Sequence, residues 1–138
     1  MTETACPLCQ PLNENLLWRD AILLIIRVDD ADYPGFCRVI LNRHVKEMTD
    51  LPPDERAHLM QAVFVVEDAL RELMQPDKVN LAALGNQVPH LHWHIIPRFA
   101  DDAHFPDPVW AVARRAGRAH PVDGARLAQI ITRRLTTG

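Results

Sequence analysis

The sequence predicts an α+β domain built on a mainly antiparallel sheet, with one long helix and a short C-terminal helix. Short apolar runs bounded by turn-forming residues indicate strands, whereas one longer segment repeats its apolar residues every three or four positions. The predicted order is therefore strands, helix, strands, a loop-rich segment and a terminal helix. The sequence contains no internal repeat, low-complexity tract or linker that would divide it.

Length and composition fit one domain over residues 1–138. Of these residues 48% are hydrophobic, which is enough to bury a core without disulfide bonds. The formal charge of −3 gives no overall bias toward nucleic acid or anionic membranes, and the longest apolar run, AILLII, is too short to cross a bilayer. With three cysteines and no signal-peptide pattern, we expect a cytoplasmic protein that binds neither nucleic acid nor membranes.

Residues 15–28 predict the first strand. Its aliphatic run, residues 22–26, shows no alternation, which is typical of a strand buried on both faces. A segment dense in turn formers, including Pro34 and Gly35, comes next, and residues 37–42 predict a second strand. The turn between the two runs favours an antiparallel pair.

A change of period from residue 51 to about residue 75 predicts a long helix. The apolar residues that recur at three- and four-residue steps fall on one stripe of it: Leu59, Val63, Val66, Leu70 and Leu73. Pro52 and Pro53 suit the first turn of a helix, while Asp54 and Glu55 complement the positive end of its dipole. No other long helix is predicted.

Two further strands and a terminal helix complete the predicted fold. Residues 78–84 form one strand, residues 85–86 a turn, and residues 88–96 the next strand. The remainder, residues 99–138, carries several prolines and aspartates and is expected to be a loop-rich extension along the surface. A short helix from about residue 123 to residue 135 closes it.

Three of the seven histidines, His90, His92 and His94, occupy every second position of the last predicted strand. Residues two apart in a strand project from the same face, so the three imidazoles should line up on one side of the sheet. The intervening residues are expected to enter the core: Leu91, Trp93 and Ile95. An ordinary surface position would explain one such histidine, but three in register, without a Lys, Glu, Thr or Ser among them, favour a functional role.

Strand geometry disfavours a single metal ion held by all three histidines. The Cα atoms of His90 and His94 should lie about 13 Å apart, whereas a zinc–nitrogen bond is about 2 Å long. At most one end of the row is therefore expected to bind a metal. Phosphate chemistry suits the others, because an imidazole is a nucleophile at neutral pH and its neighbours can donate to phosphate oxygens or shuttle a proton.

The run HLHWHII, residues 90–96, resembles the signature of the histidine triad family of nucleotide hydrolases and transferases, in which three histidines alternate with apolar residues. The Pro-Arg pair after it and the upstream stretch CRVILNRHVKEMTDL are also similar, so the resemblance covers roughly residues 5–110. One departure is Gly35-Phe36, where many members have Gly-His. This departure removes a fourth histidine from the region of the triad.

The resemblance implies a nucleotidyl hydrolase or transferase acting on a purine nucleotide conjugate, either a dinucleoside polyphosphate or a nucleoside phosphoramidate. It implies that His92 attacks the α-phosphorus and forms a covalent nucleotidyl-histidine intermediate, which water then cleaves. His94 would donate to a phosphate or leaving-group oxygen, and His90 would fix the orientation of the other two. The family resemblance further implies a homodimer that needs no organic cofactor.

Cys6 and Cys9, in the motif CPLC, have the spacing of one half of a structural zinc site. A redox-active pair and a chance pair are the alternatives, although a redox motif would normally follow a strand, which the preceding residues do not supply. Zinc-containing members of the family are similar in using two cysteines and two histidines, which implies His44 and His90 as the other ligands. The implied metal is one structural Zn²⁺ per chain with a closed ligand set.

Substrate contacts are implied by the same resemblance. Asp29 is a candidate ribose contact, and Asn80, Asn86 and Gln87 are candidate phosphate contacts. Turn formation would explain Asp29 and Asn86 equally well. Trp110 could stack on a ligand or cap it, but a core or interface role is the favoured expectation.

Two rival functions stay open on the sequence. A non-catalytic, zinc-stabilised nucleotide-binding or regulatory protein would keep the fold and the metal, and a metal store or sensor would use the whole histidine set. The remaining histidines, His58, His104 and His120, are expected at the surface, where His104 could reach a substrate. Cys37 is expected to be a buried thiol in a strand.

Overall fold

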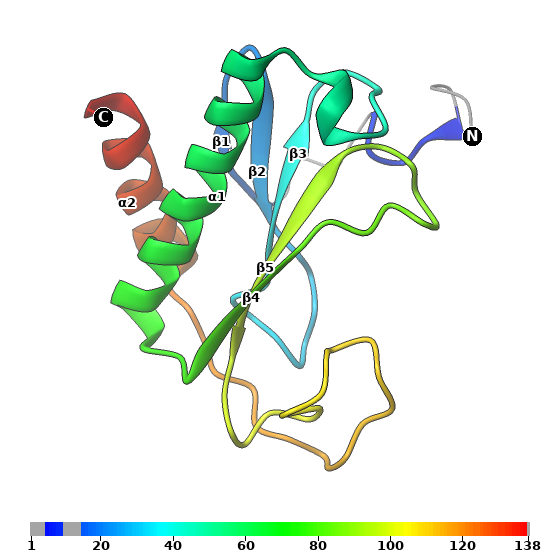
Figure 1. Cartoon of the computed structure of the whole chain (residues 1–138). Helices are drawn as coiled ribbons and strands as arrows, with labels where there is room; N and C mark the ends of the chain where they lie inside the picture. Colours follow the sequence, from blue (N-terminus) through cyan, green and yellow to red (C-terminus); the bar gives the residue numbers. More distant parts are fainter. Residues whose placement is uncertain (1–4, 10–14, 138) are drawn as a thin grey trace.

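The structure is a computed structural model that describes residues 5–9 and 15–137. One antiparallel sheet has the strand order β1-β2-β3-β5-β4. The strands are β1 (Leu16–Arg19), β2 (Leu23–Arg27), β3 (Cys37–Leu41), β4 (Lys78–Ala82) and β5 (His92–Arg98). The helices are α1 (Pro53–Met74), α2 (Gly124–Thr137) and a short 3-10 helix (Met48–Asp50). Both α-helices lie on the same face of the sheet (Figure 1), which confirms the predicted α+β class.

The single strand predicted over residues 15–28 is wrong, because this segment forms two strands, β1 and β2, joined by a tight turn. The carboxylate of Asp20 makes the turn. Its Oδ1 accepts hydrogen bonds from the backbone N–H groups of Ile22, at 2.8 Å, and Leu23, at 3.0 Å. An aspartate can form such a turn without glycine or proline, so the apolar run in the sequence hides the break.

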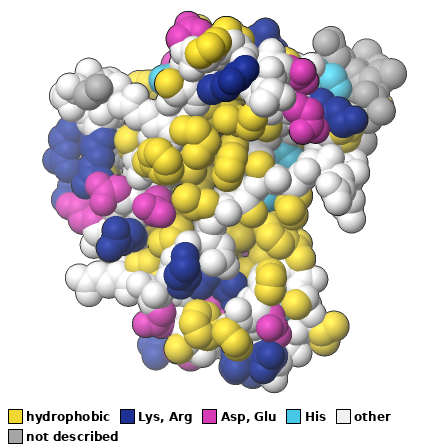
Figure 2. Space-filling model, in the orientation of Figure 1, with side chains coloured by type: hydrophobic (Ala, Val, Ile, Leu, Met, Phe, Trp, Pro, Cys, Tyr) yellow, Lys and Arg dark blue, Asp and Glu magenta, His cyan; other side chains and the backbone are white. Residues whose placement is uncertain are grey.

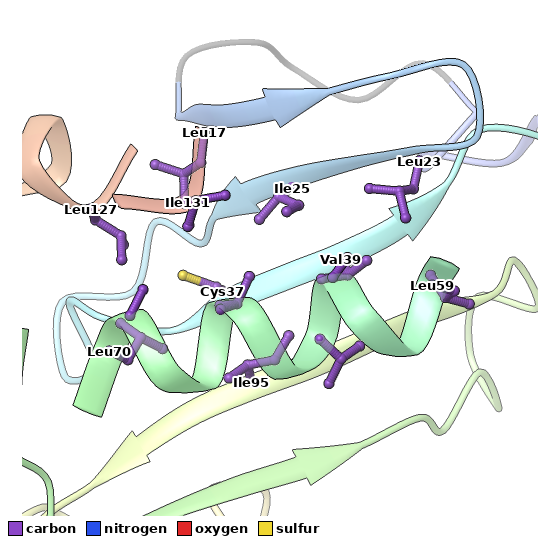
Figure 3. Close-up of a cluster of buried hydrophobic side chains, with 14 of the residues drawn as sticks. Leu17, Leu23, Ile25, Cys37, Val39, Leu59, Leu70, Ile95, Leu127 and Ile131 are labelled. Carbon is purple, nitrogen blue, oxygen red and sulfur yellow. The ribbon is translucent and has the colours of Figure 1, made fainter. Parts of the chain in front are cut away.

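Helix α1 buries the predicted apolar stripe against the sheet. Four residues of the stripe are fully buried and the fifth is partly buried: Leu59, Val63, Val66, Leu70 and Leu73. They belong to one core with Ile25, Val39 and Ile95 from the central strands β2, β3 and β5 (Figure 3). Gln75 caps the C-terminus of the helix in a left-handed conformation, with φ of 50°. The predicted helix and the predicted antiparallel pairing of β2 with β3 are both confirmed.

Strand β5 begins at His92, later than the predicted start at residue 88, and runs on to Arg98. Pro89 has no backbone N–H to contribute to a sheet, which delays the start of the strand. His90 therefore lies in the preceding loop, and only two histidines of the row alternate within β5. The predicted core positions are confirmed, since the alternating apolar residues all join the core on the helix side: Leu91, Trp93 and Ile95.

Strand β4 ends at Ala82, opposite His94, two residues before its predicted end. The chain then leaves the sheet as a loop through Gly85, whose φ of 72° lies in the left-handed region that favours glycine. Because β4 stops there, the first residues of β5 have no neighbouring strand on that side. The loop passes beside the histidines instead.

The extension after β5 contains no helix or strand between Arg98 and Gly124 in the described chain, as predicted (Figure 1). A buried ion pair fastens it to the sheet, because the guanidinium of Arg98 donates to both carboxylate oxygens of Asp102, at 2.8 and 3.0 Å. The hydroxyl group of Tyr33 donates to the same carboxylate at 3.2 Å and is hydrogen-bonded to His104 at 2.6 Å. Buried polar contacts therefore hold the extension against the sheet.

Replacing Asp102 with asparagine should lower the free energy of unfolding and make it depend less on pH in the acidic range. Burial by itself raises the pKa of Asp102, but hydrogen bonds from Arg98 and from the backbone N–H groups of Phe99, His104 and Phe105 lower it well below its ordinary value. A lowered carboxyl pKa contributes stability that is present above about pH 4 and is lost as the pH falls through the folded-state pKa. The Asp102→Asn variant lacks this charge and leaves the buried guanidinium of Arg98 without a counter-charge, at a cost of about 3 to 5 kcal/mol at pH 7.

Urea unfolding at pH 7 and pH 3 would measure this effect of Asp102. The difference in free energy of unfolding between wild type and Asp102→Asn should be smaller at pH 3 than at pH 7. At pH 3 the carboxyl group of Asp102 is mostly protonated in the unfolded wild-type chain. The other charged or titratable groups that face Asp102 do not change the sign of this effect. Tyr33 has a pKa raised to about 12 by burial and by Asp102, and Arg115 donates to the backbone carbonyl groups of Asp102 and Phe105, not to the carboxylate. An equal difference in free energy of unfolding at the two pH values would contradict stabilisation by the ionised carboxylate of Asp102.

The surface carries both signs of charge. Figure 2 shows Lys and Arg side chains interspersed with Asp and Glu around a central apolar area on one face. Among the helices of the described residues, none is long and apolar enough to span a membrane. The homodimer and the single-domain organisation remain predictions.

Candidate active site and metal centre

Cys6, Cys9, His44 and His90 bring four possible ligand atoms within 4.8 Å of one another. Nδ1 of His90 lies 3.4 Å from the Sγ atom of each cysteine and 3.3 Å from Nδ1 of His44. Two nitrogen ligands of one tetrahedral zinc ion would be about 3.3 Å apart, and a nitrogen and a sulfur ligand about 3.6 Å apart. The cluster therefore has the dimensions of a four-coordinate metal site.

His90 presents a suitable tautomer to a metal ion. Its Nε2 lies 2.6 Å from the carbonyl oxygen of Leu41, and because a carbonyl oxygen only accepts hydrogen bonds, Nε2 carries the proton. Nδ1 keeps its lone pair and faces the two cysteines and His44. Burial lowers the pKa of His90 despite the opposing hydrogen bond to Leu41, so the ring is in the neutral form that binds metals.

The two cysteines and two histidines of the cluster are suited to binding a metal ion. Two thiols and two imidazoles favour zinc in a closed tetrahedral site with no position for water. Cys6 and His90 are buried, and Cys9 and His44 are half-buried. The fold therefore brings all four predicted ligands together, from the N-terminal segment and from the loops after β3 and before β5.

His92 lies next to this cluster, and His90 fixes the orientation of its ring. Nδ1 of His92 lies 2.5 Å from the carbonyl oxygen of His90, so Nδ1 carries the proton and Nε2 keeps its lone pair. No group in the described residues hydrogen-bonds to this Nε2. Burial, together with the nearby charge of Arg38, lowers the pKa of His92 and keeps the ring neutral at pH 7. A neutral imidazole with an available Nε2 is the form that acts as a nucleophile.

His94 follows on the same strand, with its ring centroid 4.9 Å from that of His92. It packs edge-on against Phe36, at 5.6 Å, and Trp110, at 5.1 Å. Burial, followed by the charges of His92 and Arg38, lowers the pKa of His94 to about 4. Its Nδ1 is buried and finds no hydrogen-bond partner among the described residues. His94 is therefore neutral at pH 7 and offers one N–H group, not a positive charge.

A cleft of about 450 Å³ opens beside the two histidines of β5. It is lined by His92 and His94, by Asn86 and Gln87 from the loop after β4, and by residues 7–8 from the N-terminal segment. Clefts of this size hold ligands such as nucleotides. The nucleophile candidate His92 and the neutral amide groups of Asn86 and Gln87 thus line one cleft.

The four predicted substrate contacts fall into two groups. Asn86 and Gln87 line the cleft. Asn80 is not among its lining residues, and its Oδ1 accepts a hydrogen bond from Arg98 at 2.8 Å. Asp29 is exposed in the loop after β2 and also lies outside the lining. Only the two loop residues are placed to meet a ligand bound at the histidines.

The sequence patterns miss one cleft residue and misplace another. Arg38 in β3 is the register partner of His94 and lines the cleft. Its signal is a lone charge in the apolar strand CRVIL, at a position that alternates with the core residues Cys37 and Val39. Trp110 is 51% exposed and also lines the cleft, so a core role for it is wrong, while an interface role stays a prediction.

The other histidines lie outside the cleft and have structural partners. His58 and His120 are partly exposed and each pairs with an aspartate at 2.7 Å. His104 is also partly exposed and belongs to the network that anchors the extension. Cys37 is fully buried, as predicted, and burial raises the pKa of its thiol to about 12.

Comparison with known sequences identifies related proteins. A sequence model of the HIT domain matches residues 11–101. The AP-4-A phosphorylase of Mycobacterium tuberculosis is 32% identical over 78 residues, and the asymmetrical bis(5'-nucleosyl)-tetraphosphatase of Schizosaccharomyces pombe is 34% identical over 70 residues. These matches cover 52% and 47% of the chain, but only 40% and 38% of the two proteins. The chain thus matches less than half the length of these curated relatives.

Solved structures show the same fold. A histidine triad protein from Bradyrhizobium japonicum has a TM-score of 0.68 and 32% identity, with 88% of this chain and 91% of that chain covered. A Zn-bound histidine triad family protein from Mycobacterium smegmatis has a TM-score of 0.66 over 99% of this chain and 100% of that chain. At 21% identity, this second likeness shows the fold alone.

Proposed function

The chain belongs to the histidine triad family, and we propose that it is a nucleotidyl hydrolase or transferase that cleaves the bond between the α-phosphate of a nucleotide and its leaving group. The observation that carries this proposal is the hydrogen bond from Nδ1 of His92 to the His90 carbonyl, which leaves Nε2 available beside a nucleotide-sized cleft. The names of the two curated relatives, a phosphorylase and a tetraphosphatase, support a substrate joined through phosphate.

The proposed reaction has two displacement steps at one phosphorus atom. In the first, the Nε2 lone pair of His92 attacks the α-phosphorus, a P–N bond forms, and the leaving group departs with the electrons of its bond to phosphorus. In the second, water adds its oxygen to that phosphorus and the P–N bond breaks, which restores the imidazole and releases a mononucleotide. The proton lost by water balances the charge on the leaving group. An acceptor other than water would make the reaction a transfer.

The two flanking histidines have different tasks in this scheme. His94 donates its single N–H group to a non-bridging or leaving oxygen, and an approaching phosphate anion would raise its pKa. The backbone carbonyl of His90 holds the proton on Nδ1 of His92 and stabilises the positive charge that the ring gains on attack. Asn86 and Gln87, which line the cleft, would donate to the remaining phosphate oxygens.

Cys6, Cys9, His44 and His90 would hold one structural zinc ion, because two thiols and two imidazoles favour that metal. The ion would cross-link the N-terminal segment to the loops that precede α1 and β5. Its contribution to catalysis is then to keep the His90 carbonyl in place beneath His92.

A covalent adduct should be trapped on brief mixing with an adenylated conjugate. Because Nε2 of His92 has a lone pair at neutral pH, the expected species carries one nucleotidyl group per chain, attached to the peptide that contains residues 88–98. Rapid acid-free quenching and mass measurement of the intact chain and its peptides would detect it. Turnover without any such adduct would contradict the two-step scheme and favour direct attack by water.

A panel of adenylated and guanylated conjugates would identify the leaving group and the base. Release of a mononucleotide from at least one dinucleoside polyphosphate or nucleoside phosphoramidate is expected. Tight binding of nucleotides without any cleavage would favour the non-catalytic nucleotide-binding protein. Metal analysis separates the remaining rival, because a store or sensor would hold several ions per chain, whereas the structural site would hold one.

The same family membership leads us to propose a cytoplasmic homodimer. Light scattering on the purified chain would give its mass in solution. A single-chain mass at micromolar concentration would contradict the dimer without affecting the proposed chemistry.

A further inference from the structure

Arg38 lies beside the triad on the neighbouring strand. It is the register partner of His94 in the β3–β5 pairing, and its side chain lines the same cleft as His92. The guanidinium carbon lies 5.8 Å from the centroid of the Phe36 ring. An apolar surface thus supports the guanidinium where it borders the cleft.

The guanidinium of Arg38 has no counter-charge. Across residues 5–9 and 15–137, no carboxylate or carbonyl group pairs with it, and its Nε is buried without a hydrogen-bond partner. By contrast, Arg98 is paired with a carboxylate inside the fold. A half-buried cation without a partner is unfavourable. Such a group is typical of a site in which the ligand supplies the anion.

Arg38 is also the one permanent charge among the described residues that line the cleft. Burial lowers its pKa, but a guanidinium stays protonated at physiological pH. His92 and His94 are neutral at pH 7, and Asn86 and Gln87 carry neutral amides. A ligand with several negative charges therefore finds only this cation in the cleft.

We propose that Arg38 binds the phosphate chain of the substrate and makes the cleft selective for nucleotides linked through two or more phosphates. This inference rests on the proposed function and deepens it by naming the substrate class. A guanidinium offers several N–H donors in one plane and can pair with two phosphate oxygens at once. In a polyphosphate-linked nucleotide, each added phosphate adds negative charge near Arg38. A nucleotide linked to an amine has only the charge of its single phosphate.

Steady-state kinetics on two adenylated substrates would test the selectivity. With a dinucleoside polyphosphate, Arg38→Gln should lower kcat/KM by about 100-fold, mainly through KM, because a charge-assisted bidentate contact is lost. With adenosine phosphoramidate the loss should be less than about 10-fold. Arg38→Lys should recover part of the activity on the polyphosphate, because it keeps the charge without the planar fork. Equal losses on both substrates would overturn the selectivity.

Binding of inorganic tripolyphosphate, measured by calorimetry, would test the contact without any chemistry. Arg38→Gln should weaken this binding by about 10- to 100-fold relative to wild type. If wild type cleaves no conjugate but binds tripolyphosphate more tightly than Arg38→Gln does, the proposed reaction is wrong and the phosphate-binding role of Arg38 is supported. Equal affinity in the two proteins would overturn the inference, whatever the turnover.

Arg126→Gln is the matched control, because it removes the same charge from an exposed position on α2. It should bind tripolyphosphate as wild type does. A merely structural contact of Arg38 with Phe36 would change the thermal midpoint of Arg38→Gln without changing its affinity, and that result would also overturn the inference. If Arg38→Gln does not fold, Arg38→Lys tests the planar fork instead, because it keeps the charge: it should bind tripolyphosphate more weakly than wild type, and wild-type affinity would overturn the inference.

Discussion

The His92→Asn variant should lose turnover by roughly 10³-fold or more while keeping its fold and its metal. Asparagine has no imidazole lone pair with which to form the P–N bond, so the covalent route is closed. Its amide N–H group can still donate to the carbonyl of His90, which accepts from Nδ1 of His92 at 2.5 Å in wild type. The rate of mononucleotide release, the circular dichroism spectrum and the metal content would be measured together.

His120→Asn is the matched control for this experiment. His120 is partly exposed, pairs with Asp101 and lies outside the cleft lining. Its replacement removes an imidazole of the same kind and should leave turnover unchanged. Normal activity in His92→Asn, with the fold intact, would remove His92 as the nucleophile.

Loss of one metal ligand should be the most destabilising single change at the N-terminal end of the molecule. In Cys9→Ser, a weakly coordinating hydroxyl replaces a thiolate, so the metal should be lost or held far more weakly. Because binding at a structural zinc site contributes about 10 kcal/mol or more in small domains, we expect several kcal/mol of the free energy of unfolding to disappear. Metal analysis and thermal unfolding, with and without a chelator, would measure both quantities.

Cys37→Ala separates the metal from a general effect of cysteine loss. Cys37 is buried in the core and lies outside the ligand cluster, so its replacement should lower stability modestly and leave the metal content unchanged. Chelator treatment should then destabilise wild type and Cys37→Ala, and have little effect on Cys9→Ser. A Cys9→Ser protein with full metal content and wild-type stability would rule out the four-ligand site.

Local spacing predicted the elements whose pattern is regular. The stripe of α1 and the alternation of β5 both follow from residues at fixed steps along the chain, which are placed on one face by helix and strand geometry. The turn at Asp20 escaped prediction because it depends on side-chain hydrogen bonds within an apolar run. The alternation of the histidines predicts a strand from residue 88, but Pro89 lacks a backbone N–H group and β5 begins at His92.

The sequence by itself determined the α+β class, the row of histidines and the types of ligand, because these depend on residues close together in the chain. Only the tertiary structure decided which side chains share the cleft. Arg38 meets His94 through the register of β3 with β5. Trp110 reaches His94 because the extension that carries it is fastened through Arg98 and Asp102. Such contacts depend on strand pairing and long-range packing, and no local period in a sequence encodes them.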